Sequence, residues 1–181
     1  MPPAHPVEVL WCDRIRRGRR PGWCFPAKVE QLLRTLTEGQ SVLHLFGGRA
    51  GWGVRLDIDQ LVDPDVIGDA WLPPFARDSF DVVILDPPYA RVNAVEKMAL
   101  FRAAGWVARR RLIWFHTVWV SAGSGLALER SWLVRIGNNS LVRCLEVFRV
   151  KADKPGPVRY FARGPAMKYN RWLTGNRVLP L

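Results

Sequence analysis

Two stretches of the chain carry the apolar spacing of a helix with one buried face. The first spans 28–38 and is followed by Gly39, a common residue at helix ends. Its apolar positions, at i, i+3, i+4 and i+7, are Val29, Leu32, Leu33 and Leu36. The second stretch spans 93–106. Both helices are therefore expected to lean one face against a sheet.

Apolar runs of strand length predict that sheet. They occupy 41–45, 54–58, 80–85 and 112–120. Two further runs, 128–136 and 141–150, flank Gly137-Asn138-Asn139-Ser140, whose residue types are typical of a turn, so they predict an antiparallel hairpin. A short apolar run at 7–11 is either an additional edge strand or a segment that wraps the domain.

The first two connections of the predicted sheet are too short to hold helices. Eight residues separate 41–45 from 54–58, whereas a parallel crossover normally needs roughly a dozen and usually contains a helix. Prolines and glycines between Asp59 and Asp69 exclude a helix there as well. We therefore expect an α/β fold with a compact, mostly parallel sheet and an antiparallel C-terminal hairpin strand. The crossover helices after the first two strands are expected to be reduced or missing.

Composition bounds the size and the partners of this fold. The 181 residues, 49% of them apolar, suit a single domain, with an N-terminal arm at 1–23, a core at 24–150 and a tail at 151–181. The net charge of +11 comes mostly from arginine and favours a polyanion, above all nucleic acid, as the partner. No stretch is long and apolar enough to span a bilayer, so no membrane partner is expected.

Three cysteines do not make an even disulfide framework, which favours a reducing cytoplasm. Cys12, Cys24 and Cys144 also lack the close C-x-x-C pairing of zinc sites. We therefore expect structural cysteines and no metal.

Basic residues gather in the arm and in the tail. The arm holds Arg14, Arg16, Arg17, Arg19 and Arg20 among glycines and a proline, and in the tail Arg163, Lys168 and Arg171 alternate with aromatic residues. Arginines contact phosphates and aromatic rings stack under bases, so both segments are candidate nucleic-acid contacts. A solvated charge run in the arm and a tail packed on the body are the alternatives.

Asp86-Pro87-Pro88-Tyr89, directly after the apolar run 80–85, holds the most specific candidate chemistry. It falls at the carboxyl end of a buried parallel strand, the edge where open α/β folds bind ligands. Asp86 and the Pro87 carbonyl can accept hydrogen bonds from an exocyclic NH2, and Tyr89 can stack on the ring that bears it. We take all four residues, Pro88 included, as candidate catalytic residues. A plain Pro-Pro turn is the alternative.

With four upstream segments, this motif resembles the class I S-adenosylmethionine-dependent methyltransferases of the DPPY type, which modify exocyclic nitrogens of nucleic-acid bases. The segments are 24–28, 41–51, 55–59 and 68–75, and the resemblance covers about 24–150. It implies cofactor contacts at Phe25, Pro26, Lys28, His44, Phe46, Gly47, Gly48, Asp57, Asp69, Ala70 and Asp86. Asp57 is implied for the ribose hydroxyls, with Asp59 as runner-up, and Asp69 for the adenine amine. His44 and Ala50 depart from the family, which usually has an acid and often a glycine there.

The resemblance implies methyl transfer from S-adenosylmethionine to a base amine, with adenine N6 of DNA first. Cytosine N4 and adenine in RNA stay open as targets, and so do methylation of a protein amide and a non-catalytic nucleic-acid-binding module of the same fold. The resemblance also implies a cytoplasmic enzyme of prokaryotic or phage origin, and it leaves the oligomeric state open. His116, near the end of the run 112–120, is either a base or a structural histidine.

Overall fold

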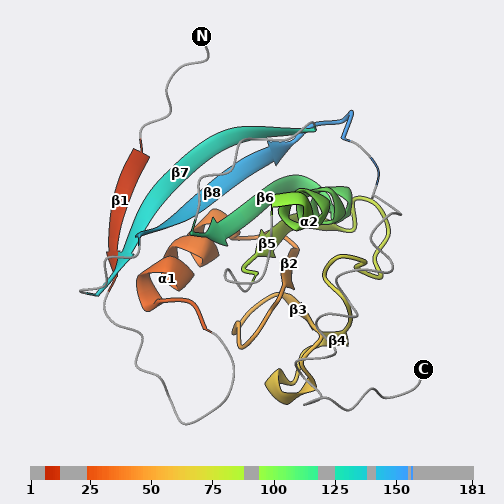
Figure 1. Cartoon of the computed structure of the whole chain (residues 1–181), viewed down its shortest axis with the longest axis horizontal. Coiled ribbons are helices and arrows are strands. Elements are labelled where there is room, and N and C mark those ends of the chain that lie inside the picture. Colours follow the sequence, from red (N-terminus) through yellow and green to blue (C-terminus); the bar gives the residue numbers. More distant parts are fainter. Residues whose placement is uncertain are drawn as a thin grey trace.

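A computed structural model describes residues 7–12, 24–87, 94–117, 125–137, 142–154 and 156. These residues form an eight-stranded sheet with one α-helix on each face (Figure 1). In chain order the elements are β1 (Val7–Cys12), α1 (Ala27–Leu36), β2 (Val42–Leu45), β3 (Val54–Asp57), the 3₁₀-helix η1 (Gln60–Val62), β4 (Val66–Ile67), β5 (Phe80–Leu85), α2 (Ala94–Val107), β6 (Ala108–His116), β7 (Leu126–Ile136) and β8 (Val142–Val150).

The sheet has the strand order β1-β7-β8-β6-β5-β2-β3-β4. Every neighbouring pair is parallel except those of β8, which runs antiparallel to β6 and β7. The predicted α/β class and the antiparallel hairpin strand are confirmed. From β2 the chain builds β3 and β4 on one side, then returns to place β5 on the other side of β2. The carboxyl ends of β2 and β5 therefore form the topological switch point, where such sheets bind ligands.

Alternating side chains divide the core between the two faces of the sheet. On one face, α1 packs Val29 and Leu33 against alternate residues of the central strands. On the other, α2 buries Leu100, Phe101 and Ala104 against the intervening residues. We call these the α1 face and the α2 face. The helices match the predicted amphipathic stretches, although α1 ends two residues before the predicted 38.

The expected loss of the crossover helices is confirmed. Residues 46–53 connect β2 to its parallel neighbour β3 without a helix, and η1 is the single helical turn between β3 and β4. The apolar run at 7–11 proves to be an edge strand, because β1 pairs with β7. β6 starts at Ala108, before the apolar run, because Ala108 pairs with Phe80 and Arg111 pairs with Val82 and Arg149. Residues 118–120 of the predicted strand lie outside the described residues.

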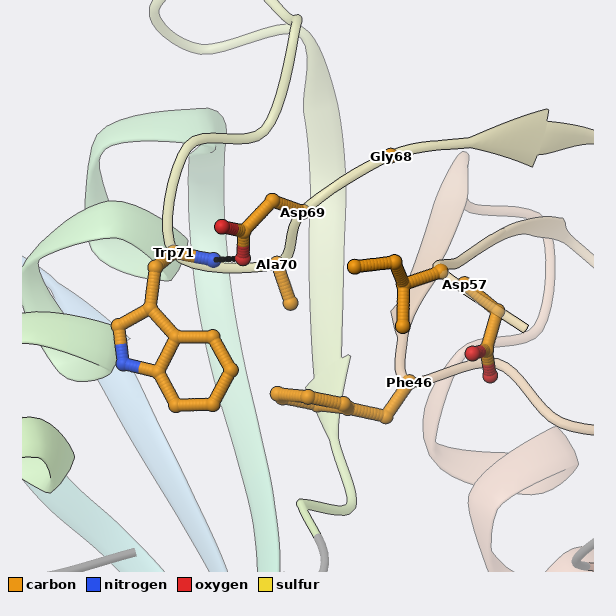
Figure 2. A pocket seen from close by; sticks show the side chains of 7 residues that line it. Phe46, Asp57, Gly68, Asp69, Ala70 and Trp71 are labelled. Carbon is orange, nitrogen blue, oxygen red and sulfur yellow. Dashed lines mark hydrogen bonds between the residues drawn. The ribbon is translucent and has the colours of Figure 1, made fainter. Parts of the chain in front are cut away.

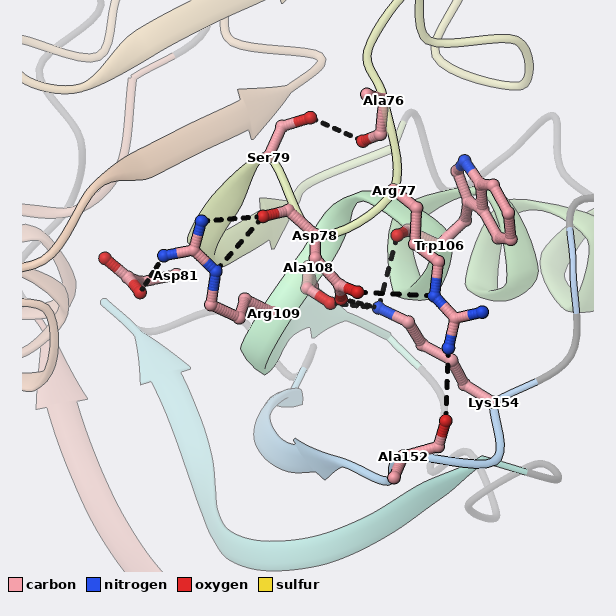
Figure 3. A network of polar contacts seen from close by, with 10 residues as sticks. All are labelled: Ala76, Arg77, Asp78, Ser79, Asp81, Trp106, Ala108, Arg109, Ala152 and Lys154. Atoms are coloured by element: carbon pink, nitrogen blue, oxygen red, sulfur yellow. Dashed lines mark hydrogen bonds and ion pairs between the residues drawn. The ribbon is translucent and has the colours of Figure 1, made fainter.

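A network of polar contacts connects the chain segments at the amino ends of the parallel strands β5 and β6 (Figure 3). Lys154, just after β8, is buried and donates to Asp78 and to two backbone carbonyls, those of Trp106 near the end of α2 and of Ala108 at the start of β6. Arg109 donates to the Asp78 carbonyl and pairs with Asp81. The residues that begin the tail therefore belong to the folded body. Among the described residues, no helix has the length and apolarity to cross a membrane.

Candidate active site

Four strand ends bring the sequence-predicted site residues to one edge of the sheet. Phe46 follows β2, Asp57 ends β3, Asp69 follows β4 and Asp86 follows β5. Because these four strands are parallel neighbours, their carboxyl ends lie together. The sequence order alone, read as a parallel sheet, was sufficient to predict this convergence.

A small pocket opens at the ends of β3 and β4 (Figure 2). It is lined by Phe46, Asp57, Ile58, Gly68, Asp69, Ala70 and Trp71. The Phe46 and Trp71 rings meet edge to face with their centroids 5.3 Å apart, and Asp69 and Asp57 lie at opposite ends of the pocket. An apolar floor between two carboxylates suits a flat, amine-bearing ring joined to a sugar.

The backbone at the end of β2 is strained where it enters the pocket. Phe46 has φ of +60°, a left-handed conformation that few residues with a side chain adopt. At Gly47, by contrast, the missing side chain is explained by packing: a Cβ there would lie 2.7 Å from the Cβ of Arg55. The close approach predicted for this glycine is therefore to β3. Gly48, with φ of +48°, turns its N–H toward Asp57.

Asp57 is held as a preoriented acceptor, and its runner-up Asp59 is used elsewhere. The two carboxylate oxygens of Asp57 accept from the Gly48 and Asp59 backbone N–H groups, each at 3.0 Å. Each oxygen keeps a second lone pair, so the carboxylate can still accept from a diol. The Asp59 side chain caps η1 by accepting from Leu61 N–H at 3.0 Å. Because the Asp59 carboxylate already caps η1, Asp57 is the better candidate for accepting from the ribose hydroxyls.

Asp69 combines a turn-forming role with a position in the pocket. One carboxylate oxygen accepts from Trp71 N–H at 2.9 Å. Burial raises the pKa of Asp69, and the Trp71 hydrogen bond partly offsets this. The carboxyl group sits in a poorly hydrated wall beside Ala70, where a donor from a ligand would be strongly favoured.

His44 lies behind this edge, on the α1 face, and does not line the pocket. Its ring is 1% exposed, contacts Trp52 edge to face at 4.5 Å and lies near Phe25. Burial lowers the pKa of His44 to about 4, and the positive charges of Arg34 and Arg55 act in the same direction. Among the described residues neither ring nitrogen reaches a hydrogen-bond partner, although the Trp52 backbone comes close enough to favour the protonated ring.

The segment before α1, which was predicted to contact the cofactor, lies beside His44. Phe25 is buried against His44, Trp52 and Phe115, and Pro26 occupies the N-cap position of α1 without a side-chain cap. Lys28 is exposed in the first turn. Phe25 thus joins the aromatic packing under the carboxyl edge.

Asp86 and Pro87 are buried at the end of β5, with Asp86 only 7% exposed. Pro88 and Tyr89, the remaining candidate catalytic residues, lie outside the described residues. The same holds for the basic candidates of the arm and the tail, namely Arg14, Arg16, Arg17, Arg19, Arg20, Arg163, Lys168 and Arg171.

His116 forms a buried pair with Glu146 of β8. Its Nε2 lies 2.7 Å from a carboxylate oxygen, and the two side chains are 2% and 0% exposed. Burial lowers the pKa of His116 and Glu146 opposes that effect. A histidine with so close a partner fits the structural alternative for this residue.

Two further residues lie at this edge that were not predicted from the sequence as site residues. Phe115 lies one position beyond the paired Leu85 and Trp114, so it is the β6 neighbour of Asp86. The guanidinium of Arg143, at the start of β8, lies over the Phe115 ring, 5.3 Å from its centroid. Neither belongs to a motif; an arginine next to the start of a mostly apolar strand was the available signal. Within the described ranges, no cluster of metal-ligating side chains is present.

Several solved structures with a similar fold are named as methyltransferases. The chain superposes on yhhF from Escherichia coli, which is named as a methyltransferase, with a TM-score of 0.53 and 16% identity over 77% of this chain and 98% of that one. For the N-methyltransferase NodS from Bradyrhizobium japonicum the TM-score is 0.52, with 12% identity over 68% and 95%. The chain therefore shares its fold with these two structures.

A third similar structure carries ligands. It is the Thermus thermophilus 16S rRNA N2 G1207 methyltransferase in complex with AdoMet and guanosine, with a TM-score of 0.50 and 16% identity. The match covers 77% of this chain and 43% of that chain. No protein-family model and no curated protein sequence matches the chain.

Proposed function

We propose that the protein transfers the methyl group of S-adenosylmethionine to the exocyclic amine of a nucleic-acid base, with adenine N6 of DNA as the first candidate. The observation that carries this proposal is the convergence of the Asp57–Asp69 pocket and the buried Asp86 at the switch point of a methyltransferase fold.

The residues of the pocket fit the adenosine part of this cofactor. Asp57, oriented by two backbone N–H groups, would accept from the ribose hydroxyls. The Phe46 and Trp71 rings would hold the purine, and Asp69 would accept from its amine. An adenosine-sized ligand therefore finds both an apolar surface and acceptors of the required kind.

Asp86 would act on the other substrate, since β2 lies between β5 and the two strands, β3 and β4, whose ends form most of the pocket. It would accept a hydrogen bond from the target amine, with the Pro87 carbonyl as second acceptor. When bound, the cofactor supplies a methyl group on a sulfonium sulfur; the amine nitrogen forms the new N–C bond as the S–C bond breaks, and one amine proton leaves to water. Asp86 would orient the nitrogen lone pair and stabilise the positive charge developing there.

A nucleic-acid substrate is supported by the net charge of +11 and by the arginines of the arm. The third similar structure, whose substrate is an exocyclic amine of an rRNA base, has the same fold. Because contacts from these arginines to phosphates carry no sequence information, we expect short or broad sequence preference and easier action on single strands, where extruding a base costs less.

The test is to incubate the protein with cofactor labelled in the methyl group and with separate DNA and RNA pools, then digest to nucleosides. We expect label in N6-methyladenine from DNA. Label in N4-methylcytosine, or from RNA alone, would move the target to an alternative. No labelled nucleoside from either pool would refute the proposal, and the absence of binding heat with millimolar cofactor would favour a non-catalytic module.

A further inference from the structure

Arg143, on β8, lies toward the carboxyl end of the α1 face, over the Phe115 ring. Arg111, Arg130 and Arg149 lie toward the amino end of the same face. Of the arginines that β6, β7 and β8 place on this face, Arg143 is therefore the one beside the candidate catalytic edge.

Asp86, Phe115 and Arg143 form a row across three adjacent strands. Asp86 lies beside Phe115, and β8 continues the row because Phe115 pairs with Leu145 and Arg143 lies two residues further toward the edge. Two sheet spacings of about 4.8 Å place the Arg143 backbone roughly 10 Å to the side of Asp86. A nucleotide whose base reaches Asp86 can bring a backbone phosphate over that distance.

The contact with Phe115 prepares the guanidinium for such a phosphate. All five N–H donors of arginine lie in the guanidinium plane, so a group resting on a ring directs them sideways, away from the ring. Phe115 is fully buried and is further fixed by Phe25 at 6.0 Å. The ring is a rigid support, which lowers the entropy cost of forming a bidentate contact.

A positive charge at this edge would offset the negative charge of the carboxylates there. Asp57, Asp59, Asp69 and Asp86 all lie at strand ends there. A phosphate chain approaching four carboxylates is repelled unless a cation stands beside its path. We propose that Arg143 binds a backbone phosphate next to the nucleotide whose base reaches Asp86. This proposal rests on the nucleic-acid partner of the proposed function, and it names the contact that positions that partner.

The experiment measures binding of fluorescein-labelled oligothymidine by anisotropy over a range of salt concentrations. Thymine has no exocyclic amine, so this probe reports phosphate binding without methylation. For single strands, each phosphate contact adds about 0.7 to the slope of log affinity against log salt. Arg143→Gln should reduce the slope by about 0.7, and Arg143→Lys should retain it because the charge remains. Arg143→Leu, which keeps an apolar contact with Phe115, replaces Gln if that variant is unstable.

Arg149→Gln is the matched control, because Arg149 lies on the same strand and face but at the amino end, 68% exposed beside Glu129. It should leave the slope unchanged. With an adenine-containing oligonucleotide, Arg143→Gln should raise KM several-fold and leave the cofactor Kd unchanged. An unaltered slope in Arg143→Gln, or an equal loss in Arg149→Gln, would overturn the proposal. If oligothymidine binds with the expected slopes but no methyl group is transferred to the DNA or RNA pools, the proposed function is refuted and the phosphate contact stands.

Discussion

The buried His44 ring should make the protein sensitive to mild acid. Folded, its pKa is about 4, whereas the unfolded chain has the ordinary value of 6.5. Below pH 6.5 His44 therefore binds a proton in the unfolded chain, whereas in the folded protein it stays neutral down to about pH 4. The free energy of unfolding falls as the pH drops through this window, and below the folded pKa no further loss follows.

The size of this effect follows from the two pKa values. Since a tenfold difference in proton affinity is worth about 1.4 kcal/mol, His44 should remove roughly 2 kcal/mol of stability between pH 7 and pH 4.5. In His44→Phe the ring contacts with Trp52 and Phe25 can persist while the titration is absent. The stability of the variant should therefore rise by roughly 2 kcal/mol relative to the wild-type protein over the same interval.

Urea unfolding at a series of pH values, followed by tryptophan fluorescence, measures this difference. The other titrating groups are common to both proteins, and their contributions cancel in the comparison. A stability difference that stays constant from pH 7 to pH 4.5 would show that His44 is hydrated or hydrogen-bonded in the folded protein, and would refute the reasoning.

Three further outcomes are expected. Gly47→Ala should destabilise the fold by roughly 1–3 kcal/mol in urea unfolding, because its Cβ would lie 2.7 Å from the Cβ of Arg55; an unchanged midpoint would contradict this packing. Lys154→Met should lower the free energy of unfolding by about 1–2 kcal/mol, since it removes the donor to the Trp106 and Ala108 carbonyls and one of the partners of Asp78, and unaltered thermal unfolding would show that the network carries no stability. Truncation at 157, which spares Lys154, should weaken oligonucleotide binding about equally on all sequences and flatten its salt slope; a loss confined to one sequence would indicate base reading by the tail.

The sequence predicted those features that follow directly from the number of residues between strands and from the order of the strands. Eight residues between two parallel strands leave no room for a helix, so the bare connection after β2 was predictable. The convergence of Asp57, Asp69 and Asp86 was predictable for a related reason, since successive parallel strands end at one edge.

Other features depend on contacts between distant residues and could not be predicted this way. Nothing local distinguishes Asp57 from Asp59; the choice follows from Gly48 N–H reaching one and Leu61 N–H the other. The left-handed backbone of Phe46 is likewise imposed by its surroundings, against the preference of its residue type. Arg143 meets Phe115 only because β8 inserts between β6 and β7.

The central claim is that Asp57 binds the cofactor and Asp86 binds the target amine. One pair of measurements tests it. Cofactor Kd by calorimetry and single-turnover methyl transfer to a single-stranded oligonucleotide are measured on Asp86→Ala and Asp57→Ala. Asp86→Ala should lose transfer by roughly a hundredfold or more while its cofactor Kd stays within a few fold. Asp57→Ala should weaken the cofactor roughly tenfold or more and regain transfer at saturating cofactor. Equal loss of cofactor binding in both variants would contradict the assignment of the two carboxylates to different substrates.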